Sequence, residues 1–156
     1  MIKRLAEKLS SALATPDTAE ADENARESAI RMATAVLMIE VARADHEYDK
    51  SEFDMLLELI TNRFQISPEE AVELANEADE TAEDYFSLHS FTQLLNKNLN
   101  VRDKAHIISL LWQVAYADGR LDKFEDSLVL KISDLLYVSR GRVMRLKHDA
   151  KPQASE

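Results

Sequence analysis

Apolar residues recur at intervals of three and four positions along most of the chain, and this spacing predicts helices. An opening amphipathic helix is expected over residues 1–14, with the stripe Ile2, Leu5, Leu9 and Leu13. A polar, acidic segment follows over residues 15–24 and is interrupted by Pro16, which is typical of a linker. A long helix is expected over residues 26–44, and its second half is apolar on nearly all sides, as a central buried helix requires.

Helical spacing continues through the rest of the chain. Two stripes are expected to be buried, one made of Phe53, Leu56, Leu57, Ile60 and Phe64, and the other of Phe124, Leu128, Ile132, Leu135 and Leu136. Further helices are expected over residues 86–98 and after Asn100, which can cap the helix that follows it. With 2 glycines and 3 prolines the chain has little turn chemistry for strands. The pattern predicts an all-α protein of about eight helices.

An internal repeat appears when the sequence is shifted against itself. The segment Val41-Ala-Arg-Ala-Asp-His-Glu-Tyr-Asp-Lys-Ser-Glu aligns with Val114-Ala-Tyr-Ala-Asp-Gly-Arg-Leu-Asp-Lys-Phe-Glu, and Val, Ala, Ala, Asp, Asp, Lys and Glu coincide. After the loss of one residue, Phe64-Gln-Ile-Ser aligns with Leu136-Tyr-Val-Ser. Self-similarity of this kind indicates that the chain contains two copies of a three-helix unit.

Each unit joins its first two helices through a turn with three carboxylates: Asp45, Asp49 and Glu52 in the first unit, and Asp118, Asp122 and Glu125 in the second. The last two acids of each turn have the spacing of a capping box, which would account for them structurally. Asp45 and Asp118 fall at the C-terminal ends of helices, where the macrodipole disfavours an anion by about 0.3–1 kcal/mol. A bound Ca²⁺ or Mg²⁺ would offset that cost. The turns are therefore either cation sites or helix caps.

The two turns differ at one position. Gly119 follows Asp118, whereas His46 follows Asp45. Glycine adopts the left-handed backbone conformation more readily than histidine. We therefore expect the second loop to bind a cation more tightly than the first.

At these residues the sequence resembles the TerB family, the tellurite-resistance B proteins, and the related N-terminal domain of DnaJ-like co-chaperones. The resemblance covers roughly residues 29–146 and rests on Ala44-Asp45 with Asp49 and Glu52, and on Ala117-Asp118-Gly119 with Asp122 and Glu125. It implies an all-helical, duplicated fold with an acidic surface that binds divalent cations. It also implies a part in stress response and in the assembly of larger complexes, with no established catalytic activity.

Composition narrows the functional classes. A net charge of −10 disfavours nucleic acid as a partner. The absence of cysteine excludes disulfides and thiolate sites and favours the cytoplasm. No apolar stretch approaches the roughly 18 residues of a membrane span. The histidines form no zinc-binding pair and no glycine-rich phosphate loop is present, so we do not expect an enzyme. A hydrolase built on the six acids would still need substrate-positioning groups.

Charge is unevenly distributed along the chain. An acidic run without any base contains Glu69, Glu70, Glu73, Glu77, Asp79, Glu80, Glu83 and Asp84, and a basic cluster near the end contains Arg140, Arg142, Arg145 and Lys147. Such runs usually form solvated helix faces. Here the two faces are expected to give the molecule electrical poles, which could attract each other.

These observations predict an amphipathic helix and acidic linker over residues 1–24, a TerB-like helical domain over 25–148 and a disordered tail over 149–156. The expected function is a non-enzymatic, cytoplasmic binding module that responds to Ca²⁺ or Mg²⁺ and has protein partners. The alternative is an interaction scaffold that needs no metal, with its acidic loops serving as caps. Residues 1–14 could then contact a partner or a membrane surface.

Overall fold

The computed structural model describes residues 19–44, 50–84, 87–117 and 119–151, and within these ranges the chain is helical, without strands. The seven described helices are α2 (Ala19–Ala42), α3 (Lys50–Phe64), α4 (Pro68–Asp84), α5 (Leu88–Asn98), α6 (Val101–Ala115), α7 (Lys123–Leu135) and α8 (Arg140–Ala150). The prediction of an all-α fold is confirmed. The opening helix expected over residues 1–14 lies outside the described ranges. No described helix is long and apolar enough to cross a bilayer.

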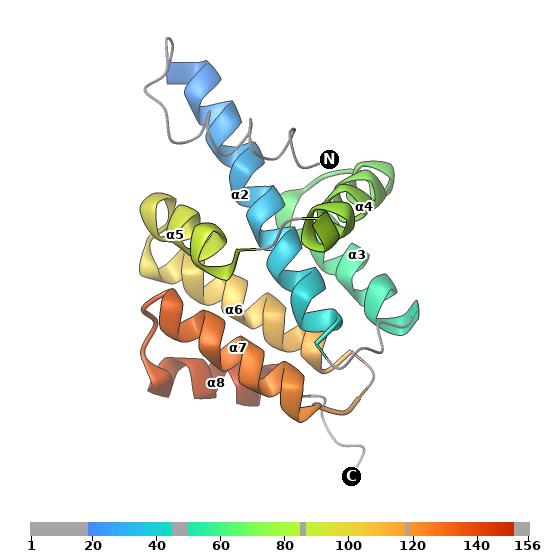
Figure 1. The fold of residues 1–156 in the computed structure, drawn as a ribbon, viewed down its shortest axis with the longest axis vertical. Helices are drawn as coiled ribbons and strands as arrows, with labels where there is room; N and C mark the ends of the chain where they lie inside the picture. The colour runs from blue at the N-terminus through green and yellow to red at the C-terminus, as the bar shows by residue number, and fades with distance from the viewer. Residues whose placement is uncertain (1–18, 45–49, 85–86, 118, 152–156) are drawn as a thin grey trace.

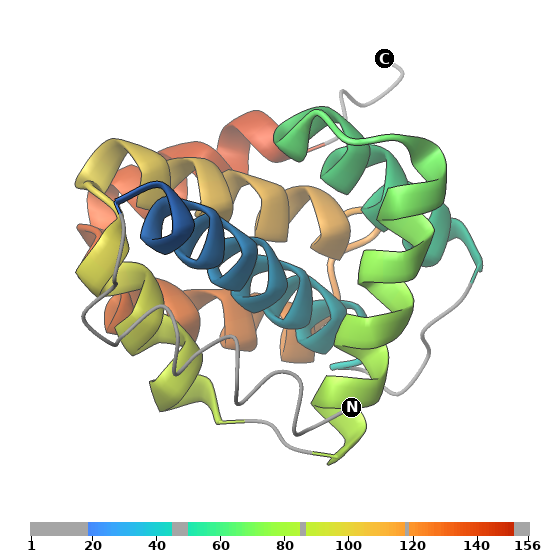
Figure 2. The ribbon, with the colours of Figure 1, turned by 90° about the horizontal axis from the view of Figure 1, so that it is seen from above.

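Helix α2 runs through the middle of the molecule (Figures 1 and 2) and packs against α3, α4, α5, α6 and α7. Its buried side chains surround the helix: Ala29, Met32, Ala33, Thr34, Ala35, Val36, Leu37, Met38, Ile39, Val41 and Ala42 are all fully buried. The Thr34 hydroxyl is satisfied by donating to the Ile30 carbonyl at 2.8 Å. The predicted central buried helix is confirmed.

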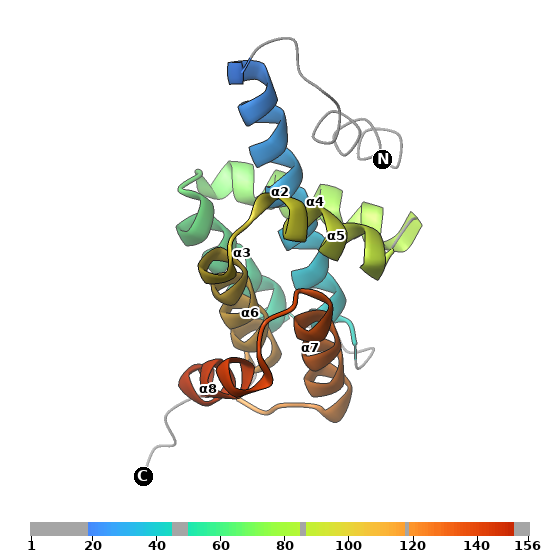
Figure 3. The ribbon, with the colours of Figure 1, turned by 90° about the vertical axis from the view of Figure 1, so that its left-hand side faces the viewer.

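The repeat is visible in how the helices pack. Helix α2 packs on α4 as α6 packs on α8, and each middle helix also touches the first helix of the other unit, α3 on α6 and α7 on α2. This exchange of partners is what two copies related by an approximate two-fold axis produce. In Figure 3, α3 and α4 lie towards the upper part of the molecule and α7 and α8 towards the lower part. Gln65 and Tyr137 end the two middle helices at equivalent positions with φ of 55° and 60°.

Helix α5 has no counterpart among the described residues. It packs on α2 and α7, and Ser87 caps its start by accepting from the Ser90 N–H at 3.2 Å. Asn100 caps α6 as predicted, because its Oδ1 accepts from the Asp103 N–H at 2.8 Å. The residue equivalent to Asn100 in the first unit is Glu27, which lies inside α2. The second unit therefore breaks the chain into α5 and α6 where the first unit continues as one helix.

Two predicted boundaries differ from the structure. Helix α2 begins at Ala19 rather than at residue 26, so residues 19–24 of the expected linker are helical. After Pro16 this stretch has no helix breaker, and its alanines and early acids favour a helix start. Helix α8 ends at Ala150, so the first two residues of the expected tail also belong to a helix.

The predicted stripe of the first unit is confirmed, since Leu56 and Ile60 are buried and Phe53, Leu57 and Phe64 pack against the core. In the second unit Ile132 and Leu136 are buried and Leu128 packs on the core, with Leu135 half-buried.

Phe124 was assigned wrongly, because it is 54 % exposed. The repeat register gives the reason: Phe124 aligns with exposed Ser51, whereas the inner face carries Glu125 and Val129 in place of Glu52 and Leu56.

Candidate functional site

The second acidic loop starts from a tight turn at the end of α6. The Tyr116 N–H donates to the Trp112 carbonyl at 3.0 Å, and the Ala117 N–H donates to the Val114 carbonyl at 3.1 Å. The Gly119 N–H then donates to the Tyr116 carbonyl at 2.8 Å, with φ of +87° at Gly119. The left-handed conformation predicted for Gly119 is confirmed. A residue with a Cβ would be strained at this φ even though the space beside it is open.

Asp122 and Glu125 form a capping box at the start of α7. The Asp122 Oδ2 accepts from the Phe124 N–H at 2.7 Å, and the Asp122 N–H donates to Glu125 Oε1 at 3.3 Å. Glu125 is only 3 % exposed. The capping role predicted for this pair is confirmed, and Asp122 Oδ2 and Glu125 Oε1 both take part in it.

The first loop follows the same turn at the end of α2. The Ala44 N–H donates to the Val41 carbonyl at 3.2 Å, which is the contact made by the equivalent Ala117 and Val114 in the second unit. Glu52 is 2 % exposed on α3, in the place that Glu125 has on α7. Both units therefore bury an acidic side chain one turn into the middle helix.

Three of the six predicted site residues lie outside the described ranges, namely Asp45, Asp49 and Asp118. The other three, Glu52, Asp122 and Glu125, are placed at the N-terminal ends of α3 and α7. Among the described residues no three acidic or histidine side chains converge closely enough to hold a metal ion. A cation at the first loop would need Asp45 and Asp49 in addition to the described acids. A cation at the second loop would need Asp118.

Charge near the first loop is concentrated on the last turns of α2. Burial raises the pKa of Glu40 above its ordinary value, against the attraction of Arg43, and the nearby Asp79 raises that pKa further. Arg43 Nη1 lies 3.6 Å from Asp79 Oδ1 and links α2 to α4. Gln113 stands at the position of Glu40 in the second unit. The helix end before the first loop therefore carries the carboxylate of Glu40, whereas the helix end before the second loop carries an uncharged amide.

A polar cluster beside the second loop was missed by the sequence analysis. Lys147 Nζ, on α8, lies 2.7 Å from Asp126 Oδ1, on α7, and 5.3 Å from the ring centroid of Trp112. Trp112 is fully buried, and its Nε1 has no hydrogen-bond acceptor within the described part of the chain. The three side chains connect all three helices of the second unit next to the capping box.

The repeat register contained a signal for this cluster. Asp126 stands where the first unit has Phe53, and Trp112 and Lys147 stand where it has Ile39 and Ala75. Ile39 and Ala75 are fully buried and Phe53 packs on the core. An acid in an apolar position of a repeat calls for a cation nearby, but the spacing alone does not say which helix supplies it.

The chain matches the family described as "Tellurite resistance protein TerB" over residues 31–148. The chain belongs to the TerB family. The TerB match begins inside α2 and ends inside α8, so it contains both acidic loops and nearly all of both three-helix units. TerB domains are generally non-enzymatic. No curated protein and no solved structure matches the chain.

Proposed function

We propose that this TerB domain is a non-enzymatic, cytoplasmic binding module that responds to a divalent cation and acts in stress response or in the assembly of protein complexes. The observation that carries the proposal is the duplicated helix end. In both units a buried first helix closes with the same backbone turn, immediately before an acid of the repeat. Hard cations such as Ca²⁺ and Mg²⁺ take carboxylate oxygens together with the carbonyls that end a helix.

In this proposal Asp45 and Asp49 bind the cation in the first loop, and Asp118 and Asp122 bind it in the second. Asp122 uses Oδ2 for its cap, so Oδ1 is the oxygen it would offer to a cation. Glu125 is buried and accepts the capping bond, so its role in this proposal is to orient the second loop. Glu52 is buried at the equivalent place and would orient the first loop. Either glutamate could also add an oxygen ligand to the cation. The left-handed Gly119 supports tighter binding at the second loop.

The capping box supports a second candidate, a scaffold that binds protein partners without metal. In that case the acids only satisfy free N–H groups at helix starts. The two candidates differ in one measurable property, because a ligand of the native state must raise the melting temperature with its concentration.

Calorimetric titration of the full chain with CaCl₂ and with MgCl₂ tests the proposal. Replacing Asp118 and Asp122 together by Asn keeps side-chain size and most capping capacity while removing two anionic ligands, so affinity should fall by about tenfold or more. Asp45→Asn with Asp49→Asn should weaken binding less. Asp103→Asn with Asp149→Asn removes the same charge elsewhere and should leave affinity nearly unchanged.

Absence of binding at millimolar cation would leave the scaffold candidate. Stronger weakening by the first-loop pair would reverse the ranking of the loops. A loss of metal-free stability well beyond the ~1 kcal/mol of a helix cap would mean that the second-loop acids hold a structural network instead.

A further inference from the structure

The third helices of the two units, α4 and α8, present outer faces of opposite charge. We call Glu69, Val72, Glu73, Asn76 and Glu80 the acidic face of α4, and Arg142, Met144, Arg145, His148 and Lys151 the basic face of α8. All ten residues are exposed except Arg142, which is half-buried. Each set follows the three-and-four spacing of a single side of a helix.

The charges are inverted at equivalent positions of the repeat. With one residue lost between the units, Glu73 aligns with Arg145 and Glu70 with Arg142. An exposed apolar side chain sits beside them at the same place in both helices, Val72 at 39 % exposure and Met144 at 42 %. Each face thus has an apolar contact point among charges that are mainly of one sign, since Asp149 is the only acid in α8, and the two faces complement each other.

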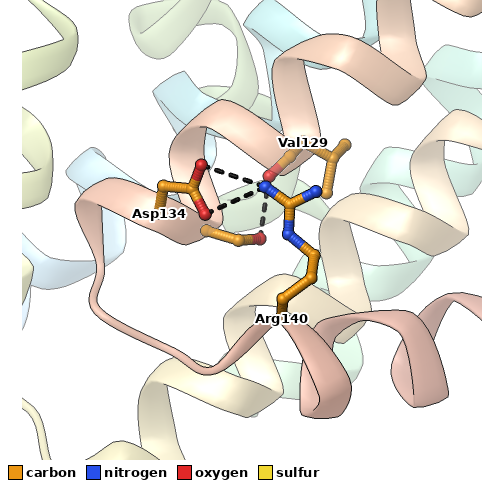
Figure 4. A network of polar contacts seen from close by, with 4 residues as sticks. Val129, Asp134 and Arg140 are labelled. Atoms are coloured by element: carbon orange, nitrogen blue, oxygen red, sulfur yellow. Dashed lines mark hydrogen bonds and ion pairs between the residues drawn. The ribbon is translucent and has the colours of Figure 1, made fainter.

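Neighbouring ion pairs leave these charges available. Arg140, at the start of α8, is occupied by both carboxylate oxygens of Asp134, at 3.1 and 3.2 Å from its Nη2 (Figure 4). Lys147 is turned inward to Asp126. Within the described ranges, Arg145 and Glu73 make no ion pair, so both can meet a partner without breaking an internal one.

The two faces cannot satisfy each other within one molecule, because α4 and α8 do not pack together and lie on different sides in Figures 1, 2 and 3. We propose that the acidic face of α4 docks on the basic face of α8 of a second copy of this chain. Such a contact joins two different surfaces, so it is head-to-tail and leaves one free face at each end. Copies would therefore add in a row rather than stop at a dimer.

Charge complementarity is the reason for choosing a second copy over another partner. The face that α8 requires, acidic with an exposed apolar residue at its centre, is present on every molecule. A net charge of −10 opposes association at long range, but screening at physiological ionic strength limits that repulsion to about 8 Å. Exposed ion pairs are individually weak, so the contact should be reversible and salt-sensitive.

Sedimentation velocity of the full chain over a range of concentrations tests this proposal. The weight-average mass should rise with concentration at physiological ionic strength, pass the mass of a dimer, and fall towards the monomer when further salt is added. Glu73→Gln with Glu80→Gln, and separately Arg142→Gln with Arg145→Gln, should each lower the association constant about fivefold to tenfold, as loss of two exposed pairs implies.

Mixing the two double variants gives the sharpest readout. Each retains one intact face, so the mixture should form a one-to-one dimer that does not grow further. Glu58→Gln on α3 and Lys131→Gln on α7 remove single exposed charges of each sign away from both faces and should associate like the unmodified chain. Circular dichroism checks that each variant is folded. We expect the helical signal to be unchanged, because glutamine is tolerated well in helices.

The proposal is overturned if the unmodified chain stays monomeric at every concentration at physiological ionic strength, or if both double variants associate as well as the unmodified chain does. A mixture that fails to form the capped dimer also overturns it, because the contact would then use another surface. If the chain does not self-associate but binds vesicles of anionic lipid through Arg142 and Arg145, the basic face is a membrane contact and the proposal is wrong. None of these outcomes depends on cation binding.

Discussion

The two three-helix units have the same helix packing but fill equivalent positions with different chemistry. Both close the first helix with the same turn, bury a glutamate at Glu52 and Glu125, and end the middle helix in a left-handed residue. The first unit is apolar around Ile39, whereas the second places an ion pair over Trp112. The two units therefore share the features that determine the backbone conformation. They differ in the side chains that lie between the helices and on the outer faces of the helices.

The largest expected effect is at the centre of that divergence. Trp112→Ala should lower the free energy of unfolding by about 3–5 kcal/mol, as expected for deletion of a fully buried large side chain. Ile39→Val, at the equivalent place, should cost about 1 kcal/mol. Trp112→Phe should cost much less than Trp112→Ala, since most of the ring volume stays and no unpaired N–H is buried. Urea unfolding measures all three variants. It is followed by circular dichroism rather than by tryptophan fluorescence, because Trp112 is the only tryptophan and two of the variants lack it.

The ion pair should give the next largest effect. Lys147→Met leaves the Asp126 carboxylate largely buried, since its side chain is 29 % exposed, and should cost about 1–3 kcal/mol. Adding Asp126→Phe copies the first unit and should recover much of that loss. A double-mutant cycle gives the coupling energy. Lys50→Met at the exposed Lys50–Asp54 pair is the control and should change stability by less than about 0.5 kcal/mol. Equal effects at both pairs would contradict the difference between the units.

The left-handed positions should respond alike in the two units. Gln65→Gly and Tyr137→Gly should each stabilise the protein by about 0.5–1 kcal/mol, because glycine removes the Cβ strain at positive φ. Gly119→Ala should have the opposite sign and a similar size. Thermal unfolding of the three variants side by side checks this. A gain at only one of Gln65 and Tyr137 would show that the two helix ends are not equivalent.

The smallest expected effect depends on pH and concerns Glu40. Its raised pKa means that stability is fully present below the ordinary value of about 4.5 and is lost as pH rises through the folded-state pKa. Glu40→Gln, which installs the residue of the second unit, should therefore raise the melting temperature at neutral pH by about 1–2 °C, discounted because the group is half exposed. The gain should vanish below about pH 4.5.

Hydrophobic periodicity predicted the helices well, because most helices in the described ranges bury one side and α2 is apolar around its circumference. Periodicity failed at Phe124, where several stripes fit the same helix and only the repeat register selects the buried one. The start of α2 at Ala19 was missed because an acidic, alanine-rich stretch carries no apolar stripe even when it is a good helix former.

The candidate site was predictable only in part. The cap formed by Asp122 and Glu125 is local, since donor and acceptor lie within one turn, and its spacing can be found in the sequence. The contact of Asp126 with Lys147 joins residues on different helices, and its partner depends on how α8 packs against α6 and α7. Burial of Glu52 depends on how α3 packs on its neighbours, and burial of Glu125 on how α7 does, so the sequence indicated acids at these positions without indicating that they are enclosed.

The position of α2 also determines how the protein can come apart. Five helices from both units pack on α2, whose buried half runs from Ala29 to Ala42, so we expect the amide protons of that half to exchange with solvent only when the whole domain opens. We expect neither repeat to be a self-sufficient fragment, because cutting the chain after α4 would expose one side of α2 and separate α6 from α2 and α3. Hydrogen exchange along α2 should therefore report global opening, and we expect the duplicated chain to unfold as one cooperative unit.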